Sequence, residues 1–249
     1  MENKKIGILG ALIIGICALL SCIALAFGLS HFRSESSHTI SATGSASVDF
    51  DADIIIWRGS FSAVDYSSQA AYSKIKSDAD EVKKYLTNNS IAEDEIVFSA
   101  VDIRRTYRDV YDVNGNYVGQ EEDGYKLTQS VTVSSKNIET VEKISRDISS
   151  LLDRGVELES DYPEYYYSAL DELKLDLIDK ASANAKERID IIAKNSGARL
   201  GKLKNSSLGV FQITAQNSGT SSYSYDGAFD TSSQHKTATI TVKLEYDLK

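Results

Sequence analysis

Residues 39–64 decide the fold, and they read TISATGSASVDFDADIIIWRGSFSAV. Small or apolar residues alternate with polar ones on both sides of Asp51–Asp53, which is the period of a half-buried β-strand. The two inward rows are Ile40, Ala42, Gly44, Ala46 and Val48, and then Ile55, Trp57, Gly59, Phe61 and Ala63. The sequence therefore predicts a β-hairpin over residues 39–64.

A helix and a second hairpin are predicted next. Residues 67–88 carry apolar side chains at helical spacing, on the face formed by Ala71, Ile75, Ala79, Val82 and Leu86. Two long strands at 96–111 and 117–135 flank Asn114–Gly115, which predicts a type I′ turn with positive φ at both central residues. On the return strand, one face is formed by Tyr125, Leu127, Val131 and Val133.

The last part of the chain contributes two helices and three strands. We expect a helix over 138–152 capped by Gly155, a short strand near 156–161, and a helix over 168–195 stopped by Gly197. The inward stripe of the last helix is Leu170, Leu173, Leu177, Ala181, Ala185, Ile189 and Ile192. Strands at 207–216 and from Ala238 to Leu248 complete the order β-β-α-β-β-α-β-α-β-β. This order predicts an α+β fold of mainly antiparallel sheets and three packed helices.

The N-terminus carries an apolar segment. Residues 6–29 contain no charged residue and are long enough, as a helix, to cross a hydrocarbon core about 30 Å thick. Since Lys4 and Lys5 precede it, residues 1–5 are predicted to be cytoplasmic and residues 6–29 a transmembrane signal-anchor. A linker at 30–38 then leads to one extracytoplasmic domain at 39–249. The alternative is a secreted domain, released by cleavage of a signal peptide near Ala24–Ala26.

Charge and cysteine content exclude several functions. The chain has 27 Lys and Arg residues against 36 Asp and Glu, a net charge of −9, which disfavours binding to phosphate backbones. We therefore interpret Arg104, Arg105 and Arg108 as a solvated strand face and predict no nucleic-acid partner. The two cysteines, Cys17 and Cys22, both lie in the apolar segment, so the predicted domain has no disulfide framework.

No catalytic, cofactor-binding or metal-binding residue is predicted. His38 and His235 are interpreted as solvated histidines. Asp112, Asn114, Asn116 and Asp123 have spacing similar to a calcium loop, but a hairpin turn explains them more simply. Ser73–Lys76 matches S-x-x-K without the other elements of a penicillin-binding site. Glu157, Glu159 and Asp161 alternate on one strand, either as paired carboxylates or as an acidic solvent face.

Tyrosine is abundant, with 14 residues in the chain. The candidate interface or ligand-contact residues are four tyrosines clustered in sequence, Tyr162, Tyr165, Tyr166 and Tyr167. Tyrosine is enriched at interfaces because its ring is apolar and its hydroxyl can form hydrogen bonds. Ordinary packing is an equally good interpretation of the cluster.

Three stretches resemble the SIMPL domain (DUF541) family of exported bacterial proteins. They are Ile40–Val48 followed by Ala52–Asp53, Gly124–Tyr125 leading into the strand through Val133, and the Ala-rich helix through Gly197 followed by Leu200–Gly201. Their order and spacing match over residues 39–216, although Ala52 stands where the family usually has Pro. The resemblance implies no common reaction. It does imply oligomeric assembly and a link to envelope stress, which are properties of some members.

We therefore expect a membrane-anchored, non-enzymatic protein that forms homo-oligomers. Flat apolar patches on sheet edges or faces would favour this function. The first alternative is a module that binds a small ligand or glycan in a tyrosine-lined cleft. The second is a hydrolase that uses acidic residues, which would need two carboxylates about 5–10 Å apart in a cleft.

Overall fold

The computed structural model describes residues 15, 19–25, 39–218 and 227–249. The fold is α+β with antiparallel sheets, as the sequence predicts. The chain divides into two compact units. The larger unit consists of Ser45–Ala181 and Leu208–Thr241, and the smaller unit of Met1–Gly44, Ser182–Ser207 and Val242–Lys249.

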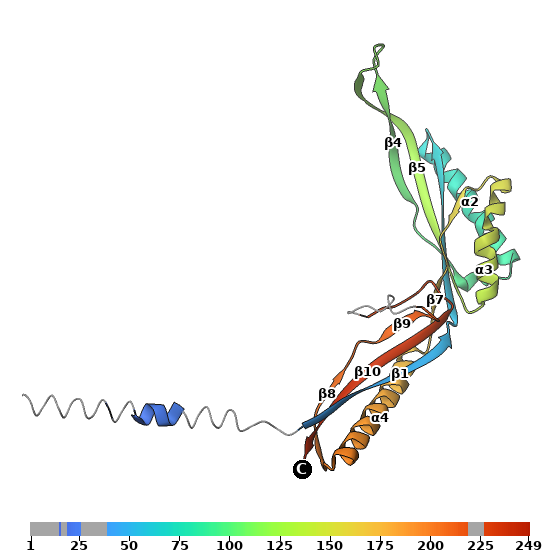
Figure 1. Ribbon diagram of the computed structural model, residues 1–249. Helices are drawn as coiled ribbons and strands as arrows, with labels where there is room; N and C mark the ends of the chain where they lie inside the picture. The colour runs from blue at the N-terminus through green and yellow to red at the C-terminus, as the bar shows by residue number, and fades with distance from the viewer. Residues whose placement is uncertain (1–14, 16–18, 26–38, 219–226) are drawn as a thin grey trace, which may run out of the picture. The chain divides into compact units, whose positions relative to one another are not determined.

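A six-stranded sheet forms the centre of the larger unit. Its strands run in the order β3 (Ile96–Phe98), β5 (Tyr117–Ser135), β2 (Ile54–Asp65) and β6 (Leu158–Ser160). β4 (Asp102–Tyr111) also pairs with β5, and β7 (Glu164–Tyr166) also pairs with β2. Every one of these pairings is antiparallel. Figure 1 shows α2 (Ser68–Asn88) and α3 (Ile138–Asp147) on one face of this sheet.

The predicted inward rows form the core between this sheet and its helices. Ile55, Trp57, Phe61 and Ala63 of β2 are buried, and Leu127, Val131 and Val133 of β5 are fully buried beside them. α2 buries Ala71, Ile75, Val82 and Leu86, as predicted, together with Asp78. Burial of these rows from both layers removes apolar surface from water and stabilises the unit.

β1 and β2 do not form the predicted hairpin. β1 (Thr39–Asp51) pairs with β10 (His235–Leu248) in a separate four-stranded sheet. Its order is β1, β10 and β8 (Leu200–Leu208), and β9 (Gln212–Ala215) also pairs with β10. At the junction, the N–H of Ala52 donates to the carbonyl of Gln234 at 2.9 Å, and that of Asp53 donates to Tyr166 at 3.0 Å. An alternating pattern predicts which face of a strand is buried, but not which strand lies beside it. The prediction was therefore right about both strands and wrong about their pairing.

β1, β10 and α4 (Leu170–Ser196) contribute residues to both units. Within the smaller unit, Ala185 and Ile189 of α4 and Val242 and Leu244 of β10 are buried. Arg188 donates from Nη1 to the carbonyl of Thr43 at 2.9 Å, which fixes this part of α4 to β1. The stripe of α4 was predicted to end at Ile192, but Ile192 is 47% exposed and Ala193 is buried instead. At 3.6 residues per turn, the fourth position after Ile189 faces inward here rather than the third.

Several predicted elements are divided in the structure. The strand predicted over 96–111 is divided into β3 and β4. The strand predicted at 207–216 covers β9 and only the end of β8, so the prediction missed most of β8. The strand near 156–161 is β6, followed by β7. The helix over 138–152 is α3 and the 3₁₀ helix η2 (Ile148–Arg154), and a second 3₁₀ helix, η1, covers Glu93–Glu95. Gly155 has a φ of 76°, which confirms the predicted left-handed cap.

The hairpin of β4 and β5 is confirmed, but its turn type differs from the prediction. Gly115 has a positive φ of 82°, whereas Asn114 is not among the residues with positive φ. The Gly115 N–H donates to the Asp112 carbonyl at 3.0 Å, and the Asp112 N–H donates to Asn116 at 2.8 Å. The loop is therefore a three-residue connection with glycine in the left-handed position, not a type I′ turn.

Most of the predicted membrane segment at 6–29, and all of the linker at 30–38, lie outside the described residues. Residues 19–25 are helical, so the described chain has a helical segment in addition to α2, α3 and α4, the three packed helices that the sequence predicts. Among the described residues, no helix is both long enough and apolar enough to span a bilayer.

Candidate functional site

The four clustered tyrosines point to separate neighbours. Tyr162 is 95% exposed. The hydroxyl of Tyr165 donates to Glu142 Oε1 of α3 at 2.6 Å, and burial together with this carboxylate raises the pKa of Tyr165 to about 12. Tyr167 packs its ring on Phe50 with the centroids 4.9 Å apart. Tyr165 and Tyr167 thus contact different parts of the fold, and the role of the four tyrosines at an interface or ligand stays a prediction.

Tyr166 belongs to a polar chain on β2 and β7. Its hydroxyl donates to Glu164 Oε2 at 3.1 Å, and the same oxygen accepts Arg58 Nη1 at 2.7 Å. The hydrogen bond from Arg58 lowers the pKa of Glu164, while burial raises the pKa of Tyr166. At pH 7 this arrangement holds a neutral phenol against an ion pair, and the ion pair links β7 to β2.

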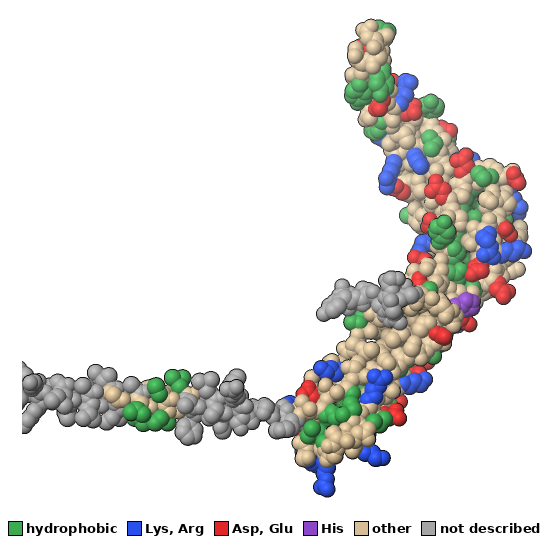
Figure 2. Space-filling model, viewed as in Figure 1, with side chains coloured by type: hydrophobic (Ala, Val, Ile, Leu, Met, Phe, Trp, Pro, Cys, Tyr) green, Lys and Arg blue, Asp and Glu red, His purple; other side chains and the backbone are tan. Residues whose placement is uncertain are grey.

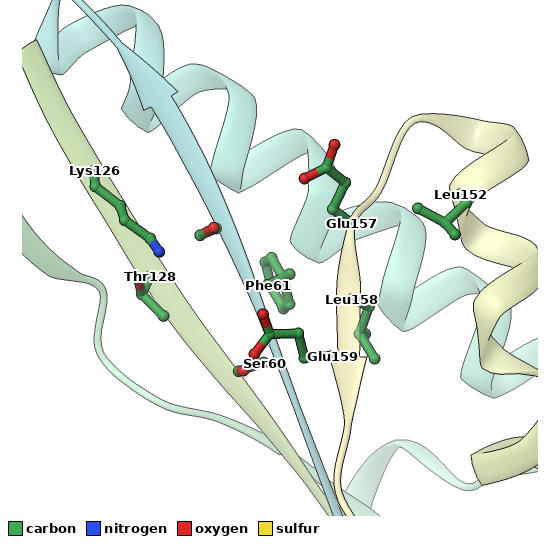
Figure 3. A pocket seen from close by; sticks show the side chains of 9 residues that line it. Ser60, Phe61, Lys126, Thr128, Leu152, Glu157, Leu158 and Glu159 are labelled. Carbon is green, nitrogen blue, oxygen red and sulfur yellow. The ribbon is translucent and has the colours of Figure 1, made fainter.

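The acidic strand lines a hollow of about 300 Å³ (Figure 3). The hollow is lined by Ser60, Phe61, Ser62, Lys126, Thr128, Leu152, Glu157, Leu158 and Glu159. Lys126 and Glu159 come from opposite sides of β2, because β5 and β6 both pair with that strand. In Figure 3 the carboxylates of Glu157 and Glu159 point in different directions, and Asp161 does not line the hollow. This arrangement could hold a small polar molecule between a cation and an anion.

The basic cluster on β4 has acidic partners on the hairpin itself. Arg104 Nε lies 2.7 Å from Asp102, Arg105 Nη1 lies 3.4 Å from Glu122, and Arg108 Nη2 lies 3.0 Å from Glu121. Each guanidinium is thus paired locally with a carboxylate, and these partners counter the attraction of the cluster for phosphate groups.

The other candidate residues have structural neighbours. Asp112 accepts the N–H groups of Asn114 and Asn116 through Oδ1, at 2.8 and 2.9 Å, and so organises the hairpin turn. His235 Nδ1 lies 2.6 Å from Asp51 Oδ1 at the surface, and Ser73 donates to the Gln69 carbonyl within α2. His38 lies outside the described residues. Within the described part of the chain, no group of three or more His, Cys, Asp or Glu residues could hold a metal ion.

Sequence reasoning missed a buried lysine. Lys236 is 3% exposed, and its Nζ donates to the main-chain carbonyl of Asp230 and lies 3.7 Å from the Asp230 carboxylate. Burial lowers the pKa of Lys236. Burial also acts to raise the pKa of Asp230, but hydrogen bonds from Ser232 bring it below its ordinary value. In the alternating pattern of β10, Lys236 falls on the inward face, and this was the sequence signal for its burial.

The exposed end of the β4–β5 hairpin was also missed. In Figure 1 the hairpin extends beyond α2 and α3, and Figure 2 shows hydrophobic side chains near its end. We call this the hairpin-end surface, and its members are Tyr107, Tyr111, Val113, Tyr117 and Val118, which are 55–101% exposed. The rings of Tyr111 and Tyr117 lie 6.0 Å apart and edge to face. The sequence signal for this surface was the presence of apolar residues on both sides of a turn, where the packing of a single chain does not require them.

The chain matches the model of a protein family. The model of SIMPL, described as a protein of unknown function (DUF541), matches residues 40–246, which confirms the predicted resemblance and extends it beyond residue 216. The search of curated proteins finds no match.

Proposed function

Because the chain belongs to the SIMPL family of proteins of unknown function, we propose a function that rests on protein contacts rather than on a reaction. The chain associates with copies of itself and serves as a non-enzymatic assembly module. Residues 6–29 hold it on a membrane, with residues 39–249 on the outer side and a role in the response to envelope stress.

The hairpin-end surface is the observation that carries this proposal. Five apolar or aromatic side chains are exposed between residues 107 and 118 of one extended hairpin, the rings of Tyr111 and Tyr117 lie edge to face, and Val113 is fully exposed. Exposed apolar surface that is contiguous marks contact sites, because water contact with it is unfavourable. Tyrosine supplies large contact area at a small cost in side-chain entropy.

The mass of the full chain in detergent solution tests self-association. Light scattering across a dilution series should give a discrete oligomer for the natural sequence. A Val113→Ser and Val118→Ser double variant should have a lower mass at the same concentration, because it removes exposed apolar surface from the hairpin end. A concentration-independent monomer of the natural sequence contradicts the proposal.

A matched control comes from the same sheet. Val64 and Val97 are 63% and 62% exposed, similar to Val118 at 61%, but they lie outside the hairpin. The Val64→Ser and Val97→Ser double variant loses the same atoms and should keep the mass of the natural protein. Equal effects of the two double variants would show that general hydrophobicity, rather than the hairpin-end surface, causes the association.

Membrane attachment has a separate test. The full chain should stay with membranes during alkaline carbonate extraction, and a chain lacking residues 6–29 should be released. Release of the intact full chain would contradict the anchor and favour the cleaved form.

The hollow on β2 supports a second candidate function, the binding of a small polar or zwitterionic molecule. Its volume of about 300 Å³ is at the lower limit of ordinary ligand sites. A screen of zwitterionic amino acids and amino sugars by nuclear magnetic resonance should shift the signals of Ser60 and Thr128. Lys126→Ala should abolish those shifts if the hollow is the site.

A further inference from the structure

β4 is a long edge strand with a free side. Among the described residues it pairs with β5 alone, over Asp102–Tyr111. The sheet register shifts twice, and both times the additional residue, Asp123 or Val118, is on β5. β4 itself has no bulge and no proline. Natural edge strands are usually short, bulged or interrupted, because an open row of N–H and C=O groups recruits another strand.

One face of β4 presents five exposed side chains. Alternate residues of a strand share a face, and this set is Ile103, Arg105, Tyr107, Asp109 and Tyr111. Three of the five are large hydrophobic side chains, exposed by 55–58%. The charges on this face have opposite signs on the two sides of Tyr107, with a cation two positions before it and an anion two positions after it.

The side chains on this face of β4 are complementary to the same side chains of a second, antiparallel copy. If two copies of β4 lie antiparallel with Tyr107 opposite itself, Arg105 lies opposite Asp109 and Ile103 lies opposite Tyr111. A twofold axis produces each of the last two pairs twice. Cross-strand pairs of opposite charge and pairs of apolar residues both stabilise an antiparallel sheet.

Neighbouring registers are less favourable. The nearest registers are centred on the residue before or after Tyr107. Centring the pairing on Thr106 places Arg104 opposite Arg108, and centring it on Arg108 places two Arg108 guanidinium groups opposite each other. Like charges directly opposite each other destabilise a strand pair. The register centred on Tyr107 avoids both contacts.

The charged groups can accept these additional partners. Arg105 binds Glu122 through Nη1, and a guanidinium carries five N–H donors in total. Asp109 accepts Gln120 through Oδ1, and a carboxylate has two oxygens that can accept hydrogen bonds. The contacts within the hairpin therefore remain when the second copy binds.

We propose that β4 pairs antiparallel with β4 of a second copy, with Tyr107 on the twofold axis. This inference rests on the proposed self-association and identifies the strand pairing within it; Tyr107 and Tyr111 belong both to this face of β4 and to the hairpin-end surface. The result is an isologous dimer in which the six-stranded sheets of two chains continue into one another. An extended segment of another protein added to the same edge is the competing occupant.

Cysteine cross-linking in the full chain tests the register. Cys17 and Cys22 are the only cysteines, so replacing both with serine leaves a background without thiols. Tyr107→Cys should then form a disulfide-linked dimer under mild oxidation, because directly opposed residues lie within the range of Cα separations that a disulfide needs.

Two further variants supply the matched controls. Ile103→Cys and Tyr111→Cys should each remain uncross-linked alone, since in this register each lies about 27 Å from its own copy. An equal mixture of the two should cross-link, because the two residues oppose each other. Cross-linking of Ile103→Cys alone as readily as of Tyr107→Cys would overturn the register.

Charge reversal provides an independent test. Arg105→Glu should weaken dimerisation at least roughly tenfold, since it places two carboxylates opposite each other at two symmetric positions. Adding Asp109→Arg should restore most of the affinity, while far-ultraviolet circular dichroism should show the same fold for both variants. Failure of the double variant to recover would contradict the proposed pairing.

The two proposals fail in distinguishable ways. A monomeric natural protein in light scattering removes self-association and the β4 contact together. A stable oligomer that Tyr107→Cys does not cross-link keeps self-association and eliminates the β4 edge as its contact.

Discussion

At the scale of single residues, Gly124 is held by two constraints. Its φ is +108°, and a Cβ at this position would lie 2.6 Å from the Asp65 carbonyl oxygen and 3.0 Å from Tyr66 Cα. Both neighbouring atoms are main chain and cannot rotate away. The β5 register shift beside Thr106 lies at this glycine, as is usual where a bulge needs positive φ.

We therefore expect Gly124→Ala to lower the free energy of unfolding by more than about 2 kcal/mol. The control is Gly155→Ala, because Gly155 also has positive φ but has no atom within 4 Å of the added Cβ. That variant should cost only about 1 kcal/mol. Urea denaturation measures both values, and equal costs would show that the close approach to Asp65 is unimportant.

Tyr165 makes stability depend on pH in the alkaline range. Its folded pKa is about 12 against an ordinary value of 10.0, so its contribution is fully present below pH 10 and is lost as the pH rises through 12. Tyr165→Phe should cost about 1 kcal/mol at pH 8 and should then lose stability less steeply than the natural protein between pH 10 and 12.

Tyr162→Phe is the control for this comparison. Tyr162 is 95% exposed, so its variant should follow the stability curve of the natural protein at every pH. Thermal or urea melts at closely spaced pH values give the curves. If both variants flattened the alkaline limb equally, the hydrogen bond to Glu142 would not be the cause.

At the scale of elements, the β4–β5 hairpin has its own local stability. Asp112 accepts three hydrogen bonds from Asn114 and Asn116, and the backbone bond from Asn116 is the main reason why its pKa is lowered. The loop lies beyond the part of the sheet that α2 and α3 cover (Figure 1). Loss of the turn should therefore open the hairpin end and leave the core folded.

Asp112→Ala should accelerate hydrogen exchange of the amides at 110–118 by about tenfold, and the urea midpoint should stay nearly unchanged. Exchange of the core amides of Val131 and Val133 serves as the internal reference. A large drop in the global midpoint would show that the hairpin end and the core unfold as one.

At the scale of the whole molecule, the buried apolar side chains of the described chain all lie between Ala52 and Leu244. Hydrophobic burial is the main stabilising contribution to a folded domain, so removal of residues 1–38 should change the melting temperature by less than about 2 °C. Circular dichroism measures it on the shortened chain. A loss of cooperative melting would mean that the N-terminal residues take part in the fold.

Local sequence patterns were enough to assign the buried face of each element. Alternation in β2 and β10 and helical spacing in α2 follow from local geometry, so Trp57, Ile75 and Ile240 could be assigned to the interior without any partner being known. The cap at Gly155 was equally local, since only glycine adopts that φ readily. The family resemblance depended on the same local patterns.

Which elements lie beside one another became known from the three-dimensional fold. β1 pairs with β10 and not with β2, and β4 has an open edge. Three of the clustered tyrosines contact different residues, namely Glu142, Glu164 and Phe50. A strand offers the same N–H and C=O groups to every possible neighbour, so its partner depends on the packing of residues distant in sequence. The candidate contact surface follows from that choice, because an edge exists only once the sheet order is fixed.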